Sequence, residues 1–153
     1  MISIAVLTLH SWLRWLVLLT GLVAFGRAAA GASGRKPWKP SDDRAGFWFV
    51  MALDVQFLLG LSLYAFLSPI TQAAFADFGA AMKSSGLRFW AVEHVAGMLI
   101  GVSLAHVGRA RTRKTDSFRR HKVAAIFFGL ALAAILASIP WPGTPNARPL
   151  LRW

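Results

Sequence analysis

Two histidines interrupt long apolar segments of this chain, and both have side chains that can bind a metal. His10 lies in the apolar run 2–26, and His94 lies in LRFWAVEHVAGMLIGVSLAHVG, residues 87–108. A neutral imidazole binds a haem iron through one ring nitrogen, and two imidazoles that face each other across a helix bundle supply both axial bonds. Ionisable residues inside apolar segments are costly in lipid and mark functional sites there. We therefore begin from the hypothesis that His10 and His94 bind one haem iron.

These histidines are carried by four apolar segments, which cover approximately residues 2–26, 45–67, 87–108 and 122–139. Hydrophobic residues make up 56% of the 153 residues, a composition typical of an integral membrane protein. A helix needs about 20 apolar residues to cross a bilayer, and each segment is near or above that length. The tail 140–153 is rich in proline and cannot continue a helix. The sequence predicts an all-α membrane protein, with residues 1–153 forming one four-helix, up-down-up-down bundle.

The basic residues predict how the bundle is oriented in the membrane. The net charge is +11, with five Lys or Arg in the connection 27–44 and seven in 109–122. The connection 68–86 carries one, Lys83. The positive-inside rule therefore places these two connections in the cytoplasm and both termini on the outer side of the membrane. Because the positive charge lies in loops beside apolar segments, lipid headgroups explain it better than nucleic acid does.

Helix geometry places the two histidines at similar depths in the bilayer. His10 lies about 12 Å and His94 about 10 Å inside the outer edge, on the first and third helices. These helices are diagonal partners in an antiparallel bundle. Gly97 and Gly101 fall within about 60° of His94 around the helix axis, where they predict a groove beside a bound haem. The competing interpretation is structural: two small residues four apart also favour close helix packing, and a membrane histidine can simply bond a neighbouring helix.

Arg14 and Asp54 are charged residues inside the first and second apolar segments. Arg14 lies one turn beyond His10 on the same face, and Asp54 reaches a similar depth from the opposite side. An ion pair between them would offset much of the cost of burying either charge. The alternatives are a proton relay or a positive charge that tunes a haem potential, so Arg14 is also a candidate cofactor-binding residue.

His106 and His121 predict a weaker second haem site near the inner surface. His106 is rotated about 120° from His94 around the helix. His121 lies within the basic run Arg119–Lys122, where an exposed interfacial histidine is the ordinary explanation. Glu93 points away from His94, and we expect it to pair with Arg88.

Several other chemistries are disfavoured by the sequence. The chain has no cysteine, which excludes disulfides, Fe–S clusters and covalently attached haem. The methionines are scattered, so no soft-ligand cluster indicates copper handling. No arrangement of nucleophile and base, and no phosphate-binding loop, indicates a hydrolase or a kinase, so no catalytic residue is predicted.

Five segments carry a resemblance to a known family: LHSWLRW (9–15), FWAVEHVAGM (89–98), HVGRARTRK (106–114), RHKVAAIFF (120–128) and SIPWP (138–142). Together they resemble a group of small four-helix bacterial membrane proteins labelled cytochrome b. The resemblance implies a b-type haem in a respiratory or photosynthetic membrane. It also implies a bacterial inner membrane, in which the outer side that holds both termini is the periplasm. The positions of this chain that match the pattern are His10, His94 and His121, whereas His106 is not part of it.

These observations together favour electron transfer over a stand-alone enzyme. We expect one haem b, with two as an alternative, and electron exchange with quinol or with other subunits of a membrane complex. The second hypothesis is a cofactor-free accessory subunit that packs against a larger membrane complex. A haem spectrum separates the two.

Overall fold

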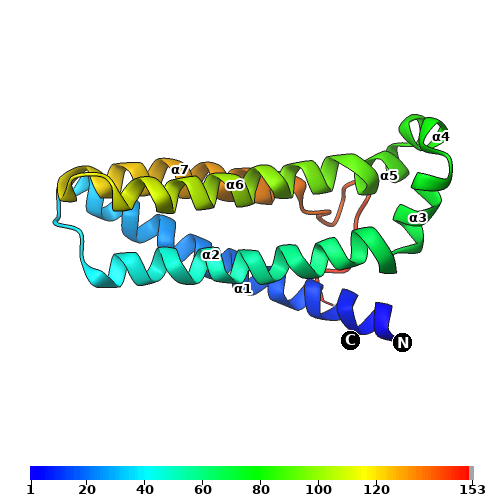
Figure 1. Cartoon of the computed structure of the whole chain (residues 1–153), viewed down its shortest axis with the longest axis horizontal. Helices are drawn as coiled ribbons and strands as arrows, with labels where there is room; N and C mark the ends of the chain where they lie inside the picture. Colours follow the sequence, from blue (N-terminus) through cyan, green and yellow to red (C-terminus); the bar gives the residue numbers. More distant parts are fainter. Residues whose placement is uncertain (152–153) are drawn as a thin grey trace.

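Four long helices lie side by side in the computed structural model, which describes residues 1–151 apart from the side chain of Phe118 (Figure 1). They are α1 (Ile2–Ser33), α2 (Pro40–Ser62), α6 (His94–Arg113) and α7 (Ser117–Ser138). The π-helical turn η1 (Leu63–Leu67) extends α2, while α5 (Ser85–Arg88) and the π-helical turn η2 (Phe89–Glu93) lead directly into α6. In this part of the chain, four helical stretches are long and apolar enough to cross a membrane. The prediction of an all-α bundle of four helices, each long and apolar enough to span a membrane, is confirmed.

Each helical span extends beyond its apolar segment at one end or at both. α1 continues to Ser33 rather than ending near residue 26, because alanines follow the apolar run and support a helix outside it. α2 begins at Pro40, a residue suited to the first helical turn. The carboxylate of Asp42 accepts a hydrogen bond from the Lys39 backbone nitrogen at 2.9 Å, which caps this end. Asp42 is thus part of the cap of α2, and the helix begins before residue 45, where the apolar segment starts.

The four helices form a ring in the order α1, α2, α6 and α7. α7 packs along both α1 and α6, and α1 packs along α2, whereas α2 and α6 approach each other over a shorter length. α1 and α6 are consequently diagonal partners, as the up-down-up-down topology predicts. Phe49 of α2 and Phe128 of α7 meet edge-to-face in the centre, with ring centroids 5.6 Å apart.

Glycines allow α6 to approach α7 closely. A Cβ atom at Gly97 would collide with the Ser138 side chain, and one at Gly101 would lie 2.8 Å from Cγ1 of Ile135. The small residues on α6 therefore face α7. The predicted groove beside His94 is wrong, because side chains of α7 already fill the space over both glycines.

The remaining elements gather at one end of the bundle. α3 (Pro69–Ala76) and α4 (Phe78–Lys83) connect α2 to α5, at the same end as the start of α1 (Figure 1). Residues 140–151 contain no regular helix, as their prolines predict, and fold back toward α1 at this end. The two basic connections lie at the opposite end (Figure 1).

We predict that Gly108→Ala destabilises the bundle, because the added Cβ would lie 2.5 Å from Cβ of Phe127, an atom held directly by the α7 backbone. The expected loss is about 1–3 kcal/mol. Gly26→Ala is the matched control, since a Cβ there meets nothing within 4 Å and alanine favours a helix. Thermal unfolding in one detergent measures both. A Gly108→Ala protein as stable as the Gly26→Ala protein would contradict this packing.

Candidate cofactor-binding cavity

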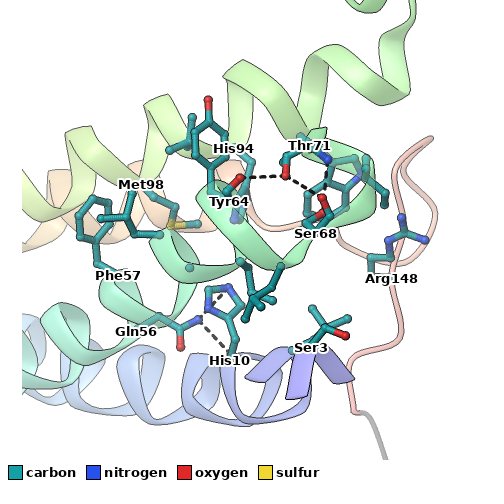
Figure 2. Close-up of a pocket in the computed structure, with 18 of the residues that line it drawn as sticks. Ser3, His10, Gln56, Phe57, Tyr64, Ser68, Thr71, His94, Met98 and Arg148 are labelled. Carbon is teal, nitrogen blue, oxygen red and sulfur yellow. Dashed lines mark hydrogen bonds between the residues drawn. The ribbon is translucent and has the colours of Figure 1, made fainter. Parts of the chain in front are cut away.

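A cavity of about 440 Å³ lies between α1, α2, α3 and α6 and is lined by both His10 and His94. Figure 2 shows the two rings entering this space from opposite helices. Most of the wall is apolar, and Leu53, Phe57 and Met98 contribute to it. The cavity forms where α2 and α6 are least closely packed. The structure thus brings together the two histidines that the sequence selected.

His10 is held in place by α2. The Gln56 amide nitrogen donates a hydrogen bond to the His10 backbone carbonyl at 3.0 Å and lies 3.3 Å from His10 Nε2. His10 Nδ1 is buried and has no hydrogen-bond partner within the described residues. Gly60 leaves room for the ring, because a Cβ there would lie 3.0 Å from His10 Cε1. His10 therefore has a restrained ring and an unused ring nitrogen.

His94 is oriented by the end of α7. Its Nδ1 lies 2.8 Å from the carbonyl oxygen of Ser138, the last residue of α7. A carbonyl at a helix C-terminus lacks an amide donor within its own helix and is free to accept. Because a carbonyl can only accept, Nδ1 carries the proton and Nε2 keeps its lone pair. This is the arrangement that orients histidine ligands in metal sites.

His94 is also placed by two π-helical turns, elements that recur at functional sites in membrane and soluble helices. η2 ends at Glu93, directly before His94, and η1 lies opposite it on the α2 side. The Tyr64 hydroxyl of η1 donates to the Ala91 carbonyl of η2 at 2.8 Å. Thr71 donates to the Tyr64 carbonyl at 2.9 Å. These bonds satisfy carbonyls that the wide turns expose and tie the two sides of the cavity together.

Arg14 lies beside the histidines in a smaller cavity of about 80 Å³, which His10, His94 and Arg148 also line. Its guanidinium donates to the Leu150 carbonyl at 2.5 Å, and Trp15 Nε1 donates to the same oxygen at 3.1 Å. Arg14 therefore holds the tail against α1 and places positive charge close to both imidazoles.

The ion pair predicted between Arg14 and Asp54 is not formed. Asp54 Oδ1 lies 2.7 Å from Nε2 of His106 instead, across the α2–α6 contact. These two side chains are 35% and 50% exposed, so the pair lies at the outside of the bundle. Depth alone suggested the wrong partner, because it carries no information on which side of α2 Asp54 lies.

His106 and His121 are not brought together. His121 is 2% exposed, and its ring fills the space over Gly31 of α1. It also packs against Trp38, with ring centroids 4.9 Å apart. The expectation that His121 is exposed is wrong, because the long α1 continues past the apolar run and covers it.

The expected surface contact of Glu93 is confirmed, with Arg88 Nε donating to Glu93 Oε1 at 2.7 Å.

The sequence did not single out four residues of this cavity as site residues: Gln56, Gly60, Tyr64 and Arg148. Gln56 offered one signal, a polar side chain within an apolar segment. Arg148 offered none, because its position depends on how the tail folds back.

Comparisons with protein-family models, with curated proteins and with solved structures found no match to this chain.

We predict energetic coupling between Asp54 and His106 and none between Asp54 and Arg14. In a double-mutant cycle, Asp54→Asn and His106→Ala should be non-additive in the free energy of unfolding by about 0.5 kcal/mol or more. Asp54→Asn and Arg14→Leu should add to within about 0.5 kcal/mol. Denaturant titrations of the purified variants in one detergent measure each term. Coupling to Arg14 alone would contradict the observed pairing.

Proposed function

We propose that this protein is a membrane b-type cytochrome that binds haem between His10 of α1 and His94 of α6 and transfers electrons. The observation that supports the proposal is that two imidazoles from diagonal helices line one apolar cavity of about 440 Å³. That volume falls within the range of roughly 300–1,000 Å³ usual for sites that enclose a small organic ligand.

The donor groups in the cavity suit a haem. His94 has its Nδ1 proton engaged by Ser138, which leaves Nε2 as a ligand atom. His10 has a buried ring nitrogen with no partner in the described chain, and a buried polar atom without a partner is costly. Each side of the cavity thus presents one imidazole. His94 offers the Nε2 lone pair, whereas the Gln56 amide can only donate to His10 Nε2, so binding of an iron at His10 Nδ1 would require the Nδ1 proton to leave and the Gln56 amide to turn away. Haem, when bound, supplies a one-electron redox couple whose potential depends on its ligands and surroundings.

The protein's own residues have three roles in this proposal. The Gln56 amide, through its contact with Nε2 of His10, and the Ser138 carbonyl orient the two imidazoles. Apolar side chains such as Phe57 and Met98 exclude water from the cavity. Arg14 contributes positive charge, which favours an electron-rich, reduced site. Quinol and other subunits of a respiratory or photosynthetic complex are the proposed electron-transfer partners.

We further propose that both termini and the α3–α4 connection face the periplasm of a bacterial inner membrane. The connections rich in Lys and Arg, 27–44 and 109–122, share the opposite end of the bundle (Figure 1). Positive charge in short loops is retained on the cytoplasmic side during insertion.

The haem proposal predicts that His10→Ala and His94→Ala each abolish the b-type absorption band of the purified, dithionite-reduced protein. Each histidine would hold the haem iron through one ring nitrogen, so its removal would weaken or abolish haem binding. His106→Ala is the matched control and should retain the band, because His106 contacts Asp54 rather than the cavity. A colourless wild-type protein would overturn the proposal and favour the cofactor-free accessory subunit. A band lost only with His106→Ala or His121→Ala would show that the haem site lies elsewhere.

The orientation is tested by labelling single cysteines, which is straightforward because the chain has none of its own. We expect Ser85→Cys to react with a membrane-impermeant maleimide in spheroplasts, and Lys36→Cys to react only after lysis. Both positions are exposed: Ser85 begins α5, and Lys36 lies between α1 and α2 at the opposite end of the bundle (Figure 1). The reverse pattern would invert the proposed orientation.

A further inference from the structure

The large cavity has an uneven distribution of polarity. Arg148 lines it at the tail end, on the same side as the hydroxyl groups of Ser3 and Ser68, while Phe57 and Met98 lie at the far side (Figure 2). No Asp or Glu is among its lining residues, and Arg148 is the one Arg or Lys among them in the described chain. A ligand that fits this cavity has an apolar body and an acidic edge.

Arg148 has no acidic partner of its own within residues 1–151. The acidic side chains that form ion pairs do so elsewhere, namely Asp42 with Arg27, Asp43 with Arg109, Asp54 with His106 and Glu93 with Arg88. Asp77 caps α4, and Asp116 precedes α7 at the opposite end. Nothing in this part of the chain neutralises the guanidinium, although it is partly buried.

The tail holds Arg148 at the cavity by several contacts. Its backbone nitrogen donates to the Pro140 carbonyl at 3.2 Å, which closes the tail into a loop. Its guanidinium carbon lies 5.2 Å from the centre of the Trp90 ring on η2, within the range of a cation–π contact. Two residues further on, Leu150 is bound by Arg14 and Trp15. The side chain is therefore positioned before any ligand arrives.

We infer that Arg148 recognises a carboxylate on the ligand of this cavity. The inference rests on the proposed function: for a haem, the carboxylate is a propionate, and Arg148 directs the propionate edge toward the tail. A guanidinium binds a carboxylate through two parallel hydrogen bonds, an arrangement that lysine cannot reproduce. The tail thus selects the orientation of the ligand, while His10 and His94 hold its iron.

The test compares haemin with haemin dimethyl ester, in which both carboxylates are blocked. Each is titrated into full-length, haem-free protein in detergent, and binding is followed by the bis-imidazole spectrum. We expect the wild type to bind haemin roughly tenfold or more tightly than the ester, as a charged hydrogen bond predicts. Arg148→Gln should lower haemin affinity by a similar factor and leave the ester affinity unchanged. Arg148→Lys should keep only part of the preference.

Arg88→Gln is the matched control, because it removes the same charge at the same end of the bundle from a residue paired with Glu93. It should keep the wild-type preference. Equal binding of haemin and ester by the wild type, or equal weakening of both by Arg148→Gln, would overturn the inference.

Failure of the proposed function gives a different result, namely no bis-imidazole spectrum with either compound. Calorimetric titration with oleate and methyl oleate then decides whether Arg148 recognises a carboxylate on another apolar acid. A preference for oleate that Arg148→Gln removes would support that recognition. No preference, or one that Arg148→Gln leaves intact, would overturn it.

Discussion

α6 lies close against α7 because glycines replace side chains along their contact, and the remaining architecture depends on this approach. Gly97, Gly101 and Gly108 each face a side chain of α7. Within a bilayer, where apolar side chains gain little by leaving lipid, such close contact is a main source of helix association. A helix drawn toward one neighbour leaves more space beside the other. The cavity opens on that other side, between α6 and α2.

The lack of water within a bilayer explains how polar groups are accommodated in this apolar bundle. Each polar group in the spans that was singled out by the sequence has a specific local contact. His94 bonds the final carbonyl of α7, the backbone of His10 accepts from Gln56, and Asp54 meets His106. Unsatisfied polar atoms are expensive in lipid, so their partners are found on the nearest helix. His10 Nδ1, Gln56 Oε1 and His121 Nδ1 are exceptions within the described residues, and of these His10 and Gln56 line the cavity.

The tail has a larger role than its composition suggests. Its prolines prevent a fifth helix, and the resulting loop returns across the end of the bundle to α1. Arg14 thereby becomes part of the attachment of the tail instead of an ion pair with α2. The tail also brings Arg148 to a cavity formed by helices far from it in sequence. One polar end of the cavity is therefore built by the last residues of the chain.

The sequence by itself determined the four spans, their alternating directions and the placement of His10 and His94 at similar levels on diagonal helices. Hydrophobic length and the 1.5 Å rise per residue are local properties that need no knowledge of neighbours. Only the tertiary structure decided which helix each polar residue or glycine faces. Gly97 and Gly101, predicted to line a haem groove, meet α7 instead. Asp54, predicted to pair with Arg14, contacts His106 instead. His121, expected at the surface, is buried under α1. The depth of a residue follows from its position along its own helix. Which neighbouring helix the residue faces depends on how every helix in the bundle is rotated, and only packing sets that rotation.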